Sequence, residues 1–498
     1  MVIISTNPAT LEENGRVDET PVEALDDIVQ LAKVAQREWR SLEVTQRARI
    51  VVKVNEYLAK NIDEISTLIS TETGKPTLEA FVSEVYGAMD AGFYYYTIAP
   101  EVLEKKEEIN LGFYNSLQKT SYVMFKPAGI VGVIGPYNYP FAIPFSQTLQ
   151  SLIAGNAVIF KPSSDTVLTG QKIQEVFDSV DDLPRNLMTT VYGDGPTVGN
   201  GVVERVNRVI FTGSTETGKR IMQKAAERLT PVCLELGGKS EMIILPDANM
   251  DRAVLAARWG CFTNSGQVCS SVKRLFLHEG IASEFTTRLV ELTKQLRQGN
   301  PLDPDVDVGA MVNEAQMNKV LQAIDLAISE GAEVLCGGRR NPNFDGYFIE
   351  PTILGKCTNS MQCVQREIFG PVLPIVAFQT EDEAIEMAND NPYGLTSSIW
   401  TNDIERGTEL AKRLETGTAM VNEVVYTFAL SQTPWGGVKS SGIGRTHGKF
   451  GFMEVVDPFH LNVDTYAEPD AWWMPYDKDF ASMMENFKLI AKSLVVKD

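Results

Sequence analysis

The chain contains, between Ile130 and Pro162, the stretch IVGVIGPYNYPFAIPFSQTLQSLIAGNAVIFKP. Its first run, Ile130 to Ile134, is apolar and β-branched, and a second run of this kind follows from Ala157 to Phe160. Three prolines interrupt the apolar segment after the first run, so it is too short to cross a bilayer and is interpreted as a buried strand that enters a turn. Because a helical segment separates the two strands, the stretch predicts a parallel sheet with a crossover helix.

The same alternation of strands and helices extends along most of the chain. Further strands are expected at residues 188–192, 208–212, 242–245, 274–278, 333–335, 372–378 and 419–422. The first hundred residues are instead mostly helical: a capping-box pattern begins at Thr20, apolar residues with helical spacing follow up to Trp39, and a second helix is expected from about Gln46 to Ile69. Two α/β domains fit this order better than one, with a boundary near residue 236.

Composition describes a globular protein of the size of an enzyme. The chain has 498 residues, of which 44% are hydrophobic and 22% charged, so two or three domains are expected. Its net charge of −20 repels phosphate backbones, so no nucleic-acid partner is expected. The first residues lack a basic segment followed by a long apolar one, which predicts a cytoplasmic protein. Six cysteines without paired spacing predict neither a disulfide framework nor a metal site.

The residues after Val463 predict an amphipathic helix. Apolar side chains recur at helical spacing from Phe480 to Leu494. Such a helix can dock on its own protein or on a sister subunit. A membrane-surface role is the weaker alternative, because basic residues are not concentrated on its polar face, and no membrane partner is expected.

Two residues stand where their chemistry could be used. Cys269 lies in the polar connection FTNSGQVCS, residues 262–270, where a thiol can meet a ligand, although packing as a small hydrophobe is the stronger alternative from local sequence alone. Glu235 lies between two leucines just before a Gly-Gly turn, where desolvation would raise its pKa toward that of a general base. The alternative for Glu235 is a helix cap or an ion pair with Lys239.

Glycines between a predicted strand and helix indicate a phosphate site. The segment FTGSTETGK, residues 211–219, puts glycine and free N–H groups at a helix N-terminus, which favours phosphate. A second glycine-rich segment precedes it, at residues 193–199, and Lys161 follows another strand. Neither segment matches G-x-G-x-x-G, so a bare turn is the alternative interpretation.

Eight segments together resemble the aldehyde dehydrogenase superfamily, in its non-acylating, NAD(P)-dependent form. They are Asn7–Thr10, Gly135–Pro140, Lys161–Pro162, Phe211–Ser214, Glu235–Lys239, Gly266–Cys269, Glu367–Val372 and Pro434–Lys439. They occur in the family's order, and the resemblance covers roughly residues 7–463.

The resemblance implies an α/β fold with three parts. A Rossmann-like cofactor domain would comprise residues 1–109 and 126–236, and an α/β catalytic domain residues 237–440. Residues 110–125 and 454–463 would form a small β element that exchanges strands between subunits, which implies a homodimer or homotetramer. Residues 464–498 would form the C-terminal tail with the amphipathic helix.

The resemblance also implies the catalytic roles. Cys269 would add its thiolate to an aldehyde carbonyl, and the Asn138 amide with the Cys269 N–H would hold the oxyanion. Each such donor is typically worth about 3–4 kcal/mol to the barrier. After hydride transfer, Glu235 would deprotonate the water that hydrolyses the thioester.

For the cofactor, NAD or NADP, the family's motifs imply sixteen contact residues. They are Pro136, Tyr137, Lys161, Ser163, Ser164, Gly195, Gly199, Phe211, Thr212, Gly213, Ser214, Thr217, Leu236, Gly237, Glu367 and Phe369. In relatives, the diphosphate lies near Ser214, and Lys161 and Glu367 contact the two riboses. NAD-preferring relatives often carry Glu where this chain has Ser164. Because a hydroxyl beside a lysine can accept a 2′-phosphate, NADP is expected to be accepted at least as well as NAD.

The implied substrate pocket is aromatic and apolar. It would be lined by Tyr139, Ala142, Ile143, Ser146, Thr263, Tyr426, Phe428 and Trp435. None of these is a cation that would bind a substrate carboxylate, so a neutral apolar or aromatic aldehyde is expected rather than a semialdehyde.

Three different functions compete with the oxidation of an aldehyde to a free acid. They are those of a CoA-acylating dehydrogenase, a thiol hydrolase and a non-catalytic binding protein. The presence of Glu235 disfavours the first of them, the turn at Gly213 the second, and the intact set of site residues the third.

Overall fold

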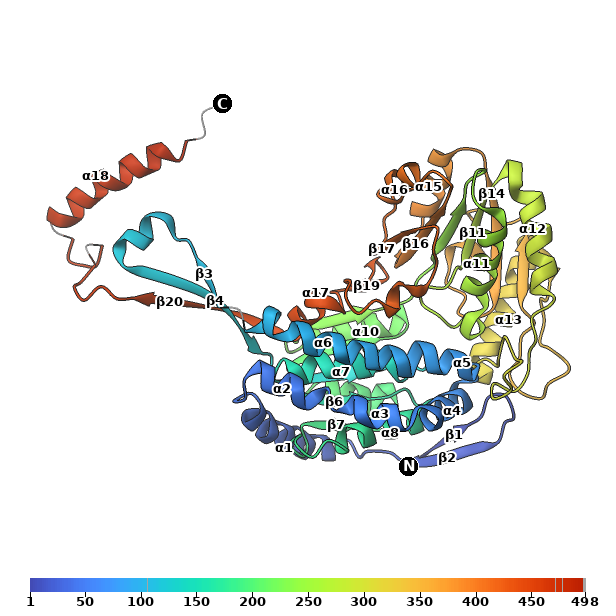
Figure 1. Cartoon of the computed structure of the whole chain (residues 1–498), viewed down its shortest axis with the longest axis horizontal. Helices are drawn as coiled ribbons and strands as arrows, with labels where there is room; N and C mark the ends of the chain where they lie inside the picture. Colours follow the sequence, from blue (N-terminus) through green and yellow to red (C-terminus); the bar gives the residue numbers. More distant parts are fainter. Residues whose placement is uncertain (105, 471, 477, 496–498) are drawn as a thin grey trace. The chain divides into compact units, whose positions relative to one another are not determined.

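The computed structural model describes residues 1–104, 106–470, 472–476 and 478–495. The chain divides into two compact units, Met1–Leu103 with Pro127–Asp457 and Glu104–Lys126 with Pro458–Asp498. The larger unit contains two mainly parallel sheets with their helices, and the smaller unit a three-stranded sheet and the C-terminal helix (Figure 1). The predicted α/β fold class is confirmed.

The first sheet of the larger unit contains the decisive stretch at its centre. The strand order is β19–β9–β8–β5–β6–β7, parallel except at β19. The strands are β5 (Ile130–Ile134), β6 (Ala157–Lys161), β7 (Met188–Thr190), β8 (Arg208–Thr212), β9 (Val232–Glu235) and β19 (Gly442–Ile443). Every residue of β5 and β6 is buried, as expected for parallel strands covered on both faces.

Helices join these strands in the predicted alternation. They are α7 (Ala142–Ile153), α8 (Val167–Asp178), the short π-helix η3 (Gly195–Gly199), α9 (Asn200–Val203) and α10 (Thr215–Ala226). The turns after β5, β6 and β8 lie at the carboxyl ends of neighbouring parallel strands, where open α/β sheets bind ligands.

The second sheet has seven strands in the order β12–β13–β14–β11–β10–β16–β17, parallel except at β12. They are β10 (Glu241–Ile244), β11 (Arg274–His278), β12 (Glu333–Cys336), β13 (Thr352–Gly355), β14 (Val372–Phe378), β16 (Thr396–Trp400) and β17 (Thr418–Val421). Its helices are α11 (Met250–Phe262), α12 (Glu279–Thr293), α13 (Glu314–Ser329), α14 (Gln362–Gln365), α15 (Glu381–Asn389) and α16 (Ile404–Ala411).

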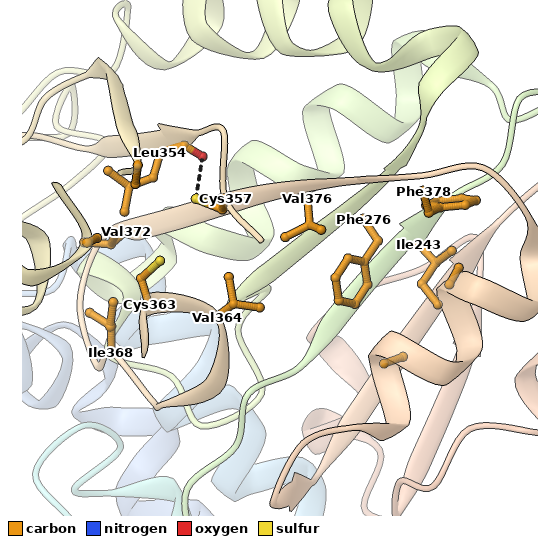
Figure 2. Packing of buried hydrophobic residues seen from close by; sticks show 14 of the residues in the cluster. Ile243, Phe276, Leu354, Cys357, Cys363, Val364, Ile368, Val372, Val376 and Phe378 are labelled. Carbon is orange, nitrogen blue, oxygen red and sulfur yellow. Dashed lines mark hydrogen bonds between the residues drawn. The ribbon is translucent and has the colours of Figure 1, made fainter. Parts of the chain in front are cut away.

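Alternate side chains along the strands of the second sheet pack into two separate hydrophobic cores. Ile243 and Phe276 point into one core with Val376 and Phe378, as Figure 2 shows, whereas their neighbours in the chain belong to the other. Successive side chains of a strand point to opposite faces, so burial of both faces requires continuous apolar strands. The second core also includes Tyr139, which lies beyond β5 of the first sheet. This core therefore joins the second sheet to the turn that follows β5.

The structure of the N-terminal region differs from the expectations from sequence in three ways. A hairpin of β1 (Val2–Thr6) and β2 (Glu13–Asp18) precedes the helices and was not expected. The capping box at Thr20 is wrong: its hydroxyl accepts the backbone N–H of Tyr192 instead, and the helix begins at Ala24. The single helix expected from Gln46 is three helices. The helices of this region are α1 (Ala24–Trp39), α2 (Val44–Val51), α3 (Val54–Lys60), α4 (Ile62–Thr73), α5 (Thr77–Ala80), the π-helical η1 (Phe81–Tyr86) and α6 (Gly87–Leu103).

Short elements complete the larger unit around the end of the first sheet. They are the 3₁₀ turns η4 (Thr263–Gly266) and η5 (Tyr426–Ala429), the paired strands β15 (Tyr393–Gly394) and β18 (Val438–Lys439), and α17 (Gly448–Met453).

The smaller unit is built from segments far apart in the sequence. Its elements are β3 (Glu107–Ile109), η2 (Gly112–Leu117), β4 (Lys119–Pro127), β20 (Val456–Asp464) and α18 (Lys478–Ser493), with the sheet order β20–β4–β3. The hydroxyl of Ser121 on β4 donates to the Asn462 amide oxygen on β20 at 2.8 Å. Within the described residues, no helix of either unit is long and apolar enough to span a membrane.

We expect the protein to be a homodimer or homotetramer in solution. β20 forms an edge of its sheet with nine residues of strand, and a free edge of this length invites pairing with another chain. Light scattering coupled to size exclusion measures the mass directly. A monomer at micromolar concentration would contradict the expectation.

Candidate active site

The loop that carries Cys269 has an unusual backbone. Between α11 and β11 the chain passes through η4, in which Asn264, Ser265 and Gly266 have φ of 48°, 55° and 72°. A Cβ atom on Gly266 would lie 2.2 Å from the carbonyl oxygen of Gly370, so only glycine fits there. Left-handed backbone at non-glycine residues costs energy and concentrates at functional sites, where the surroundings hold it in place. Here the Ser265 hydroxyl holds the loop by donating to the Gly309 carbonyl at 2.9 Å.

Asn138 lies against this loop from the turn between β5 and α7. Its side-chain amide donates to the backbone oxygen of Gln267 at 3.0 Å, two residues before Cys269. The backbone carbonyl oxygen of Asn138 accepts hydrogen bonds from Asn264 Nδ2 at 3.0 Å and from Lys75 Nζ at 2.7 Å. The structure therefore brings the predicted oxyanion donor to the loop of the predicted nucleophile.

A buried ion pair supports the turn that presents Asn138. Lys75 Nζ and Glu84 Oε1 are 2.5 Å apart, and neither side chain is exposed to solvent. The other oxygen of Glu84 accepts the N–H groups of Phe141 and Ala142, each at 2.9 Å, at the start of α7. The turn is thus fixed on both sides of Asn138.

Glu235, the last residue of β9, faces the same cavity as Cys269. Burial raises its pKa to about 8, a rise that the Arg445 guanidinium and Thr446 oppose. One oxygen accepts the Thr446 hydroxyl at 3.4 Å, and the other has no partner among the described residues. The alternative of an ion pair with Lys239 is wrong, because Lys239 Nζ also has no partner there. A buried carboxyl with one free oxygen and a pKa near 8 suits a general base.

The thiol of Cys269 is protonated at rest. Burial raises its pKa to about 11, the Lys273 ammonium opposes that rise, and the carboxylates of Glu367 and Glu235 add to it. The nucleophile therefore needs help to ionise at neutral pH.

A cavity of about 320 Å³ opens beside Cys269. Seven of the residues predicted for the substrate line it, namely Tyr139, Ala142, Ile143, Ser146, Thr263, Tyr426 and Phe428. The eighth, Trp435, lines a smaller adjoining space that contains both Cys269 and Glu235. The rings of Tyr139 and Phe428 stack 6.2 Å apart, so the wall beside Cys269 is aromatic. No described residue that lines the larger cavity is Lys or Arg.

Sequence reasoning missed several residues of this cavity, among them Glu79, His447 and Trp259. Glu79 lies in its wall and accepts the Thr263 hydroxyl at 2.9 Å and the Asn264 N–H at 2.8 Å. His447 is buried against Phe428, and that burial lowers its pKa to about 4, so its imidazole is neutral. Trp259 reaches the cavity from α11. The glutamate lies 184 residues from its partner Thr263, and no local pattern marks such a contact.

The residues predicted for the adenosine side of the cofactor gather at the end of β6. Lys161 is buried, its Nζ donates to the Pro162 carbonyl at 2.9 Å, and burial lowers its pKa to about 8. The Ser164 hydroxyl donates to the Gly193 carbonyl at 3.2 Å, and Ser163 donates to Asp165 at 3.4 Å.

The predicted glycines Gly195 and Gly199 bound η3, which lies beside that lysine. A Cβ on Gly199 would lie 3.6 Å from Lys161 Cδ, and one on Gly195 would have no neighbour within 4 Å. Asp194, just before η3, and Asp165 oppose the fall in the pKa of Lys161, so two carboxylates stand near the ammonium.

The predicted phosphate turn lies between β8 and α10. Ser214 caps α10 by accepting the N–H of Thr217 at 3.3 Å, and the Gly213 N–H donates to the Glu235 carbonyl at 3.0 Å. The predicted Phe211 and Thr212 end β8, and Thr212 also lines the small space beside Cys269 and Glu235. The phosphate turn and the predicted catalytic base are therefore joined directly.

Glu367 contributes the last group of predicted cofactor residues. Its carboxylate accepts the Gly238 N–H at 3.1 Å. A Cβ atom on Gly237 would lie only 2.1 Å from the other carboxylate oxygen, so the carboxylate packs directly against this glycine. The Phe369 ring packs edge-on against Tyr137 with centroids 6.0 Å apart. Leu236 packs on Gly218 of α10, and Pro136 lies just before Tyr137 in the turn after β5.

Tyr137 connects this group to the lysine side. The carboxylates of Asp165 and Glu367 both add to the rise that burial gives the pKa of Tyr137. The donor set fits a dinucleotide: a helix N-terminus for diphosphate, a lysine and a carboxylate for ribose hydroxyls, and aromatic and aliphatic side chains for a ring.

Comparison with known proteins agrees with this geometry. The aldehyde dehydrogenase family model matches residues 2–459. The chain is 37% identical to aminoaldehyde dehydrogenase 1 of Pisum sativum, over 96% of this chain and 95% of that protein. It is 38% identical to 4,4′-diapolycopene aldehyde oxidase of a Methylomonas species, over 90% and 83%.

Solved structures show the same relationship. An aldehyde dehydrogenase of Bacillus cereus in complex with NAD⁺ superposes with a TM-score of 0.89 at 30% identity, over 94% of each chain. The family match, the two relatives and the shared fold lead to one conclusion: this chain belongs to the aldehyde dehydrogenase family of NAD(P)-dependent oxidoreductases.

Proposed function

We propose that this enzyme oxidises a neutral, apolar or aromatic aldehyde to its carboxylic acid through Cys269. The observation that supports this proposal is one apolar cavity that contains the thiol of Cys269, adjoins the carboxyl of Glu235 and has no lysine or arginine among the described residues that line it. A semialdehyde would bring a carboxylate toward Glu79, which offers it no counter-charge.

The first chemical step is addition of the thiolate to the aldehyde. The Cys269 sulfur bonds to the carbonyl carbon, and the carbonyl oxygen takes the negative charge. The Asn138 amide, held against the Cys269 loop, and the Cys269 N–H would donate to that oxygen. When bound, NAD(P)⁺ supplies the acceptor for the hydride that leaves the same carbon, which makes the acyl group a thioester of Cys269.

Hydrolysis then releases the product. The free oxygen of Glu235 would take a proton from water, whose oxygen attacks the thioester carbon while the carbon–sulfur bond breaks. Transfer of the acyl group to CoA would need no such base, which favours hydrolysis. The family assignment favours oxidation over the alternatives of a thiol hydrolase and a non-catalytic binding protein.

We assign cofactor binding to the carboxyl end of the first sheet and to Glu367, which lies in the segment between α14 and β14 of the second sheet. Ser214 and the N-terminus of α10 would hold the diphosphate, Lys161 one ribose and Glu367 the other. We also propose that NADP is accepted at least as well as NAD. Ser164 provides a hydroxyl where NAD-preferring relatives often carry a glutamate, whose carboxylate would repel the 2′-phosphate of NADP. Lys161 can pair with that phosphate. The carboxylates of Asp194 and Asp165, which lie near Lys161, would repel the 2′-phosphate and so weaken its pairing with the lysine.

The variant Cys269→Ala should lose dehydrogenase turnover by more than about a thousandfold, because no covalent intermediate forms. Nucleotide binding, measured by calorimetry, should stay intact. Cys261→Ala is the matched control, because this buried cysteine lines neither cavity and should keep turnover. Normal formation of reduced cofactor by Cys269→Ala would overturn the assignment of the nucleophile.

The steady-state rate should rise with pH through about 8, because only the ionised form of Glu235 can take the proton of water. Glu235→Gln should still reduce one equivalent of cofactor in a stopped-flow burst and then turn over slowly, without this pH dependence. Glu79→Gln, the other carboxyl of the pocket, should keep it. Loss of the burst in Glu235→Gln would give Glu235 an earlier role, in activating Cys269.

The cofactor proposal is tested by kcat/KM for NADP and NAD with one aldehyde. A charge-assisted phosphate contact is worth roughly 1.5–3 kcal/mol, so Ser164→Glu should lower kcat/KM for NADP about ten- to a hundredfold more than for NAD. Asp194→Asn should raise it for NADP by removing a repelling charge. Equal losses in Ser164→Glu, or a wild-type preference for NAD above about tenfold, would contradict the proposal.

A further inference from the structure

Lys273 connects the nucleophile's loop to the cofactor carboxylate, and none of the roles above uses it. Its side chain is almost completely buried, and its ammonium forms an ion pair with Glu367 Oε1. The same nitrogen donates to the Gly238 carbonyl at 3.3 Å and to the carbonyl of Cys269 itself at 3.4 Å. It also lies 4.7 Å from the centre of the Phe369 ring. One cation thus contacts the thiol's own residue and a carboxylate proposed to bind ribose.

The charges around Cys269 come from several elements. Lys273 favours the thiolate, whereas Glu367 and Glu235 disfavour it. Lys239, on the segment between β9 and β10, faces Lys273, and burial lowers its pKa to about 7, so it is only partly charged at neutral pH. Arg274, whose charge acts on Lys239, is paired with Glu241 at 2.5 Å. Lys273 is therefore the cation whose charge bears most directly on the thiol.

We propose that Lys273 is a positioning residue that promotes ionisation of Cys269, and that Glu367 restrains this effect until the nucleotide engages the carboxylate. The inference rests on the proposed function, because it takes Cys269 as the nucleophile and Glu367 as the ribose ligand.

The physical reason is charge compensation in a buried site. An ammonium paired with a carboxylate presents little net field to a neighbouring sulfur, whereas an ammonium whose partner is drawn toward ribose hydroxyls presents nearly its full charge. The thiol would then stay protonated, and protected from oxidation, in the free enzyme. Binding of the nucleotide would prepare the nucleophile at the moment when it is needed.

The test measures the ionisation of Cys269 without any aldehyde. The rate of alkylation by iodoacetamide is followed from pH 6 to 10, with mass spectrometry to locate the modified residue. Lys273→Met should shift the profile of Cys269 upward by about one pKa unit, which is about a tenfold slower reaction at a fixed pH below the pKa. Glu367→Gln should shift it downward without nucleotide, and Lys273→Arg should stay close to wild type.

Nucleotide binding gives the second arm of the test. NADP⁺ should lower the apparent thiol pKa of the wild type and leave that of Glu367→Gln unchanged. Lys172→Met is the matched control: this lysine also pairs with two carboxylates, at 2.6 and 2.7 Å, but lies outside the cavity and should leave the profile unchanged.

Two results would overturn the inference: an unshifted profile in both Lys273→Met and Glu367→Gln, or an equal nucleotide effect in Glu367→Gln and wild type. Should Lys273→Met not fold, Glu367→Gln and Lys273→Arg still decide the question. Alkylation needs no substrate, so failure of the inference is distinct from failure of the proposed function, which would appear as absent aldehyde oxidation.

Discussion

The buried pair of Lys75 and Glu84 is the interaction on which the site depends. Its lysine holds the carbonyl of Asn138, and its glutamate holds the first N–H groups of α7. Breaking such a pair leaves an uncompensated buried charge, which typically costs about 3–5 kcal/mol. The helical N-terminal region, the turn after β5 and the Cys269 loop are connected through these few contacts, because Asn138 and Asn264 link the turn to that loop.

Burial keeps three titratable groups of the resting site uncharged, although the ion pair of Lys273 and Glu367 lies beside them. It keeps the thiol of Cys269 protonated, raises the pKa of Glu235 to about 8 and leaves the imidazole of His447 neutral. A neutral aldehyde can enter such a site without displacing a counter-ion. Charge appears only as the reaction proceeds, on sulfur and then on oxygen, where the donors are already in place.

The sequence predicts much of the fold because its strands are buried on both faces. Continuous apolar runs identified β5, β8, β11 and β14 at or close to their observed bounds. The capping pattern at Thr20 failed because a tertiary contact, the N–H of Tyr192, uses the hydroxyl that a cap would need.

The candidate site was likewise predictable only in part from the sequence. Cys269, Glu235 and Asn138 stand in recognisable segments, and the structure brings them together. Glu79, His447 and Lys273 could not be found from local sequence, because their importance depends on which distant side chains they contact, such as Glu367 at a separation of 94 residues from Lys273.

The left-handed turn before Cys269 limits where this enzyme can be re-engineered. Asn264, Ser265 and Gly266 adopt backbone angles that β-branched residues avoid, and Gly266 packs directly on Gly370, three residues after Glu367. A library that randomises this turn would mostly yield inactive proteins, because the nucleophile and the cofactor carboxylate would move together. The productive positions for a new substrate range are the apolar residues that line the cavity, such as Leu78, Val82, Ala91 and Ala429, because their side chains hold neither the Cys269 loop nor the turn after β5 by hydrogen bonds. Substitutions there change the volume of the cavity without disturbing the chemistry.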